Sequence, residues 1–149
     1  MSRRLFSLVL LLGLTLFAAP HVFAGSLVDD ILRYTNEFRA SKGKPPLKLN
    51  SEASDQAEEH SRDMARGRTG FGHEGFNDRV GAVSKQIGRV AAAAENVAYG
   101  DMDARQVVDG WIKSKGHRKN MLGNYDLIGI GVAKGKGGRL YFTQLFLKR

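Results

Sequence analysis

The chain has 149 residues, of which 42% are hydrophobic and 26% charged, a composition typical of one globular domain and not of a disordered segment. It contains no cysteine, which excludes disulfides, cysteine zinc sites and thiol nucleophiles. Its formal net charge of +8 favours anionic partners.

The first 24 residues have the pattern of an export signal. Arg3 and Arg4 precede an apolar run over 5–19, and Val22 and Ala24 fit the −3 and −1 positions of a cleavage site. A membrane anchor is the alternative, but the run is shorter than the roughly 20 residues that span a bilayer. We therefore expect a signal peptide at 1–24 and one domain at 25–149, secreted or periplasmic, without a transmembrane segment after cleavage. Losing both arginines lowers the net charge from +8 to +6.

Helical periodicity dominates the first part of the mature chain. Ser26 is a plausible N-cap for a helix that ends near Gly43, before Pro45 and Pro46. A second helix is expected from Asn50 or Ser51 to about residue 66. Its predicted inner face consists of Ala53, Ala57, His60 and Met64.

The next segment is a glycine-rich loop over 67–75, followed by a short helix over 76–87 and a strand over 96–99. A fourth helix, capped by Asp101 or Asp103, carries Trp111 and is expected to break at Gly116, before a short helical turn over 119–122. From residue 127 the hydrophobic period becomes two, which predicts an antiparallel hairpin that turns at 134–138. Helices followed by a sheet indicate an α+β fold.

Three side chains could carry acid, base or metal chemistry. His73 lies between glycines, His117 follows Gly116, and Glu95 follows four alanines. Two imidazoles and one carboxylate form a ligand set that zinc accepts. No local ligand spacing joins them, so a simpler alternative stays open: an exposed His73, a Glu95 that caps a backbone amide, and a His117 packed on Trp111.

Other functional classes have little support in the sequence. His60 is expected to be a hydrogen-bonded core residue, and no serine motif of a nucleophile or glycine motif of a phosphate site is present. An export signal and the absence of alternating aromatic and basic residues argue against nucleic acid. Cations surround His117, which favours an anionic envelope polymer or lipid; they are Lys113, Lys115, Arg118 and Lys119.

Seven ordered segments resemble the CAP superfamily, or SCP domain, of cysteine-rich secretory, antigen 5 and pathogenesis-related proteins, especially its disulfide-free bacterial branch. They cover nearly the whole mature chain. The segments are 34–39 with Pro46 and Leu47, 57–64, 71–73, 94–100, 111–122, 128–132 and 141–144.

The resemblance implies an α-β-α sandwich around a three-stranded antiparallel sheet. It also implies a cleft of two histidines and two acids that binds a divalent metal in several members. His73, His117 and Glu95 match three of these positions, whereas the second acid is replaced by Ser114. Zinc is then the expected ion, held by the two histidines and Glu95. The cleft is expected also to include Ser114, Asn96 and Arg118.

Three hypotheses follow for the function. The first is a binding module whose cleft holds an anionic or amphipathic envelope ligand, with or without metal. The second is a buried polar network that stabilises the fold. The third is a metal-assisted hydrolase of peptidase or esterase type, for which Glu95, His73 and His117 are the candidate catalytic residues.

Overall fold

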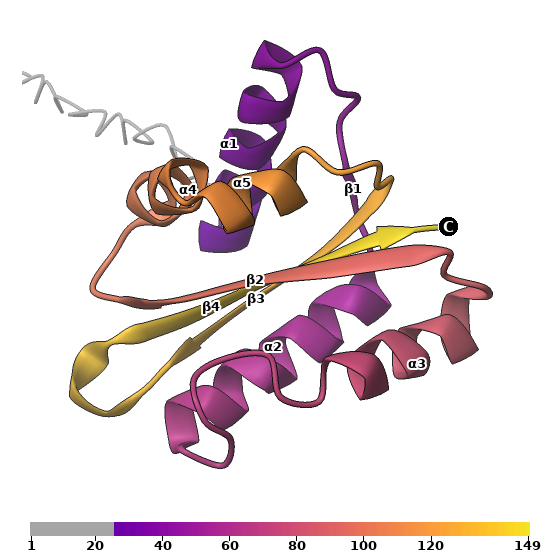
Figure 1. Ribbon diagram of the computed structural model, residues 1–149. Coiled ribbons are helices and arrows are strands. Elements are labelled where there is room, and N and C mark those ends of the chain that lie inside the picture. Colours follow the sequence, from indigo (N-terminus) through magenta and orange to yellow (C-terminus); the bar gives the residue numbers. More distant parts are fainter. Residues whose placement is uncertain (1–25) are drawn as a thin grey trace, which may run out of the picture.

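The computed structural model describes residues 26–149, so the predicted signal peptide lies outside the described residues. Two layers of helices enclose one sheet (Figure 1), which confirms the α-β-α sandwich. Helices α1 (Leu27–Ser41), α4 (Ala104–Lys113) and α5 (Lys115–Met121) cover one face, and α2 (Ser51–Arg66) and α3 (Phe76–Ile87) cover the other. The strands are β1 (Lys48–Leu49), β2 (Ala92–Gly100), β3 (Leu127–Lys134) and β4 (Leu140–Lys148).

The sheet has the order β1-β3-β4-β2, and its last three strands are antiparallel, as expected. The two-residue strand β1 pairs with β3 in parallel and raises the strand number from the expected three to four. Such a short strand has no period-two pattern that the sequence could display. Its backbone bonds, from Lys48 N to Asp126 O and from Asn50 N to Ile128 O, define it.

The starts predicted for the first, second and fourth helices are confirmed, whereas the short turn expected over 119–122 begins earlier, as α5, and one predicted break is displaced. Ser26 forms a capping box with Asp29, and Asn50 and Asp103 accept hydrogen bonds from the first turns of α2 and α4. The break that we expected at Gly116 occurs at Ser114, whose φ of −82° and ψ of 120° are extended. Glycine is only disfavoured inside a helix, and Gly116 is accommodated within α5.

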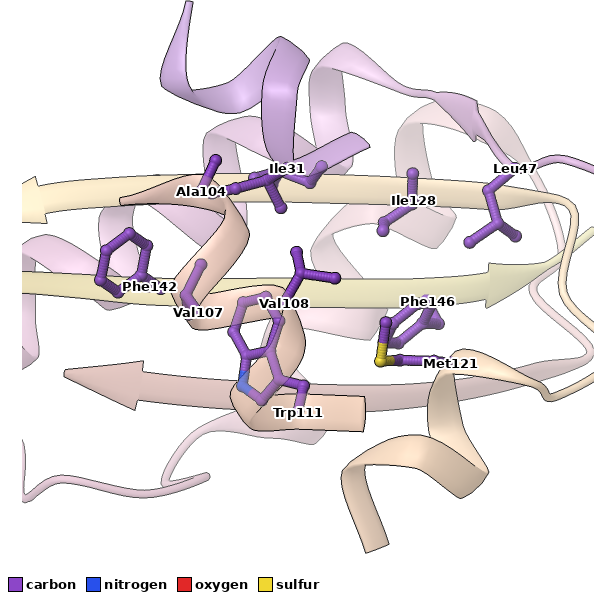
Figure 2. Close-up of a cluster of buried hydrophobic side chains, with 11 residues drawn as sticks. Ile31, Leu47, Ala104, Val107, Val108, Trp111, Met121, Ile128, Phe142 and Phe146 are labelled. Atoms are coloured by element: carbon purple, nitrogen blue, oxygen red, sulfur yellow. The ribbon is translucent and has the colours of Figure 1, made fainter. Parts of the chain in front are cut away.

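The larger core cluster lies between the sheet and the layer formed by α1, α4 and α5. Val107, Val108 and Trp111 of α4 point toward Phe142 and the neighbouring strands in Figure 2. The indole nitrogen of Trp111 donates to the carbonyl of Val97 at 3.3 Å, so its polar atom is satisfied inside the core. This cluster holds α4, and with it the start of α5, against β2.

Helix α2 lies directly on β3 because two strand positions there lack a side chain. A Cβ on Gly129 or Gly131 would come closer than 3 Å to backbone atoms of Ala53, Ala57 or neighbouring residues of α2. The hydroxyl of Ser61 donates to the Gly131 carbonyl at 3.1 Å across the same contact. This close approach sets the height of α2 above the sheet, and therefore the position of His60.

A buried arginine joins α1 to the end of α5. Arg39 is 1% exposed, and its guanidinium donates to the carbonyls of Pro45, Met121 and Gly123 at 2.9, 2.7 and 3.1 Å. Met121 is the last residue of α5 and Gly123 follows its C-cap, so the guanidinium lies at a helix end where the dipole favours a cation. Arg39 thus fixes α5 from the side opposite to β2.

Candidate functional site

The centre of the candidate site is the carboxylate of Glu95 on β2, whose side chain is only 1% exposed. Arg79 of α3 binds both carboxylate oxygens, with Nε donating to Oε2 and Nη2 donating to Oε1, each at 2.9 Å. A bidentate pair of this kind compensates two charges that burial would otherwise penalise. The alternative in which Glu95 caps a backbone amide is therefore not the arrangement found.

His73 completes the environment of the carboxylate. Its Nδ1 lies 2.9 Å from Oε1 of Glu95, and since an ionised carboxylate only accepts, Nδ1–H is the donor. In the neutral imidazole the other ring nitrogen, Nε2, then carries the lone pair, on a side chain that is 52% exposed. Glu95 therefore orients the imidazole of His73 in the manner of a buried carboxylate behind a functional histidine.

The loop before α3 is held in place by two buried side chains. His60 Nε2 donates to the carbonyl of Gly72 at 2.8 Å, and Nη1 of Arg79 donates to the carbonyl of Glu74 at 2.7 Å. Gly75 has a left-handed φ of +73°, and a Cβ there would lie 3.2 Å from Nη1 of Arg79. The turn into α3 therefore requires glycine, and the loop presents His73 to β2.

Helix α5 is attached to β2 by a chain of amides. Asn120 Nδ2 donates to the carbonyl of Glu95 at 3.1 Å and to Oδ1 of Asn96 at 3.0 Å. Asn96 in turn donates to the carbonyl of His117 and to Gln144 Oε1, each at 3.2 Å. This network fixes the backbone of His117 to β2, although His117 is not among the residues that line the adjacent cavity. Burial, and to a smaller extent repulsion from His73, lower the pKa of His117.

A cavity of about 310 Å³ opens between the loop and α5. Its lining combines polar and apolar residues. These residues are His73, Glu95 and Asn120, and Phe76, Ala93 and Ala94.

The six predicted site residues have different environments. His73 and Glu95 line the cavity and bind each other, and Asn96 is buried behind them. Ser114 ends α4, and Arg118 is exposed with Nη1 on the carbonyl of Ile112 at 3.2 Å. Whether His73, Glu95 and His117 share a metal ion stays a prediction. Across 26–149, no three His, Cys, Asp or Glu side chains are grouped closely enough to hold one.

Arg79 was not among the predicted site residues, and only a structural role in the core was predicted for His60. His60 is buried as expected, yet its Nε2 also lies 3.8 Å from Oε1 of Glu95. A signal for Arg79 was present in the sequence, because it is a cation on the apolar face of a helix, one turn after Phe76 and one turn before Val83. An arginine in such a position needs a buried acceptor.

We expect the protein to lose stability as the pH falls below about 6.5, the usual pKa of an unfolded histidine. Burial lowers the pKa of His60 and of His117 in the folded chain, so the unfolded chain binds protons first. The contribution of these two histidines to the free energy of unfolding is therefore fully present above about pH 6.5 and is lost as the pH falls below it. Urea unfolding from about pH 7.5 to about pH 5.5 measures this slope. His60→Gln should flatten it, and a flat wild-type profile would contradict the prediction.

Comparison of the sequence with known protein families and relatives agrees with this architecture. The model of the cysteine-rich secretory protein family, CAP, matches residues 32–146, and the chain belongs to this family. It is 35% identical over 124 residues to a Bacillus subtilis protein named "Uncharacterized membrane protein YlbC" and 33% identical over 122 residues to B. subtilis YkwD. These alignments cover 80% and 78% of this chain.

Solved structures show the same fold. An extracellular SCP-domain protein of Bacillus anthracis superimposes with a TM-score of 0.71 at 28% identity, over 83% of this chain and 40% of that chain. The chain spans only 34% of YlbC and 45% of YkwD. Within 26–149, none of the helices combines the length and the apolar character that crossing a bilayer requires.

Proposed function

We propose that this chain is an exported binding module whose cavity between the His73 loop and α5 holds an anionic, amphipathic ligand of the cell envelope. The extracellular SCP-domain relative and the apolar N-terminal run support export. The mixed lining supports an amphipathic ligand. An apolar part would contact Phe76 and the two alanines, and a hydroxyl group of the head would donate to Nε2 of His73.

Charge on α5 supports an anionic head group. Lys115, Arg118 and Lys119 are exposed on the helix whose Asn120 borders the cavity. None of these three cations belongs to the ion pairs found within 26–149, so their charge is available to a ligand. Such a cluster raises the local concentration of anions at the cavity entrance.

The observation that carries the proposal is the bidentate contact of Arg79 with Glu95. Both oxygens of the only carboxylate that lines the cavity within the described residues accept arginine hydrogen bonds. A carboxylate held in this way is poorly placed as a general base, because both oxygens already accept hydrogen bonds and the side chain is only 1% exposed. The cavity is therefore better equipped to bind than to remove a proton.

The test is binding of a short-chain phosphatidylglycerol, kept below its micelle concentration, measured by calorimetry. Neutralising the α5 cations by Lys115→Gln, Arg118→Gln and Lys119→Gln should weaken binding about tenfold at low salt, because each exposed charge contributes up to about 1 kcal/mol. High salt should reduce the difference by screening.

A matched control is the triple variant Lys42→Gln, Lys44→Gln and Lys48→Gln. It removes the same charge from exposed positions around β1, at the sheet edge opposite to β2. It should bind as the wild type does. Equal losses in both variants, or equal binding of phosphatidylcholine of the same chain length, would contradict the proposal.

A metal-assisted hydrolase using the same cavity is the second candidate, and the His73–Glu95 hydrogen bond favours it. Nε2 of His73 and the imidazole of His117 would be the ligands of such an ion, and Glu95 would orient His73 from behind without being a third ligand. Zinc, when bound, would lower the pKa of a coordinated water. Release of fatty acid from the phospholipid in the binding assay, lost in His73→Ala, would favour this candidate.

A further inference from the structure

Three aromatic rings gather at the end of the sheet near the β3–β4 turn. The rings of Tyr99 on β2 and Tyr141 on β4 stack at 5.7 Å, and Phe71 of the loop before His73 meets Tyr99 at 4.7 Å in an edge-on arrangement. We call these three residues the aromatic platform. Phe71 is 52% exposed and Tyr99 is 46% exposed, and they are two of the three exposed large hydrophobic residues within 26–149.

The platform is exposed because no helix continues over it. Tyr99 and Tyr141 are register partners on β2 and β4. They lie on the face that α2 covers, but α2 ends at Arg66 and the chain continues there as a loop. Apolar surface left open in this way favours binding, since a ligand removes it from water.

A polar cavity of about 390 Å³ lies next to the platform. It is lined by Asp101, Lys134, Arg139 and the turn glycines Gly137 and Gly138. Arg139 joins the two features, because its guanidinium carbon lies 5.4 Å from the centre of the Tyr99 ring. The cavity thus presents two cations and one carboxylate, and through Arg139 it borders the ring of Tyr99.

We propose that the aromatic platform and this cavity bind an acidic polysaccharide. The C–H face of a pyranose ring is weakly positive and packs on the negative face of an aromatic ring. Sugar carboxylates match Arg139 and Lys134, and hydroxyl groups match the acceptor oxygens of Asp101. A bilayer surface fits this arrangement less well, because it is flat and cannot enter a concave cavity that contains a carboxylate.

The aromatic platform and its polar cavity share no lining residue with the His73 cavity, but strand β2 runs from one site to the other. Glu95 and Tyr99 lie on one face of the strand, four residues and roughly 13 Å apart. The loop connects the two as well, since Phe71 precedes His73 by two residues and Gly72 is held by His60. The polysaccharide proposal does not depend on the ligand of the His73 cavity.

The test is binding of oligogalacturonate to the full chain, measured by calorimetry beside a neutral maltooligosaccharide of similar length and phosphatidylglycerol vesicles. Phe71→Ala and Arg139→Gln should each weaken oligogalacturonate binding about tenfold, the effect expected for losing one aromatic or charge-assisted contact. Phe71→Trp should restore binding, which shows that the ring and not the fold is responsible.

Matched controls remove the same groups elsewhere. Leu49→Ala truncates an exposed hydrophobic residue on β1, and Lys44→Gln removes an exposed cation before it. Both should bind as the wild type does, and near-ultraviolet circular dichroism should show that every variant is folded. Absence of oligogalacturonate binding, equal binding of the neutral sugar, binding to vesicles alone, or wild-type affinity in Phe71→Ala would each overturn the proposal.

Discussion

Replacing Arg79 by methionine is expected to lower the free energy of unfolding by roughly 3–5 kcal/mol. The substitution keeps much of the aliphatic volume but leaves Glu95, whose side chain is 1% exposed, without its cation. It also removes the donor to the carbonyl of Glu74, so the His73 loop loses one of its two buried anchors. Urea unfolding measures the loss, and the imidazole resonances of His73 report the change in its orientation.

A double-mutant cycle separates the buried pair from simple truncation. Glu95→Gln should also be destabilising, because it leaves the Arg79 charge without its counter-ion. The double variant should cost less than the sum of the two single variants, since no unpaired charge remains.

Arg62→Met is the matched control for this cycle. It removes an exposed arginine that pairs with Glu58 on the surface of α2, and it should cost about 1 kcal/mol or less. Similar costs for Arg79→Met and Arg62→Met, or strict additivity in the cycle, would contradict the role given to the pair.

Adding one methyl group at Gly131 should destabilise the protein by about 3 kcal/mol, at the upper end of overpacking effects. The new Cβ would lie closer than 3 Å to backbone atoms of Ala57 and Glu58. Backbone cannot move aside as the end of a flexible side chain can, so α2 has to lift from the sheet. Gly129→Ala should act in the same way against Ala53 and Ser54.

Gly110→Ala provides the matched control, because it is the same substitution in a helix with no atom within 4 Å of the new Cβ. It should stabilise the protein by about 0.5–1 kcal/mol through helix propensity. Thermal or urea unfolding of the three variants tests the prediction. Equal effects at Gly131 and Gly110 would show that the contact between α2 and β3 is not a tight one.

These two predictions concern stability, yet both act on the same site. Gly129 and Gly131 determine how closely α2 approaches the sheet, and α2 carries His60, which holds the loop at Gly72. The hypothesis of a stabilising polar network concerns the cluster of His73, Glu95 and His117 and stays a prediction, whereas the buried contacts of Glu95 are with Arg79 and His60. His73 differs from them, because it is half exposed and keeps a free ring nitrogen. The carboxylate of Glu95 thus belongs both to the buried contacts with Arg79 and His60 and to the lining of the His73 cavity.

Local signals in the sequence determined most of the elements. The caps Ser26 and Asn50 and the alternation after Leu127 each act within a few neighbouring residues, so their outcomes could be predicted. The short strand β1 and the break at Ser114 were missed. Both depend on distant partners, which are β3 for the first and, for the second, the sheet residues on which Trp111 of α4 and Met121 of α5 pack.

For the site, the sequence indicated His73, Glu95 and His117 as candidates, and the family resemblance implied that they share a cleft; of the three, His73 and Glu95 line the cavity. Only the tertiary structure decided what Glu95 does. Its partner Arg79 is 16 residues away on another element, and no periodicity records a contact between a helix and a strand. The charge of a buried carboxylate has to be compensated, but packing decides which group compensates it. Here that group is Arg79, which holds both oxygens of Glu95 and so leaves neither of them free to act as a base.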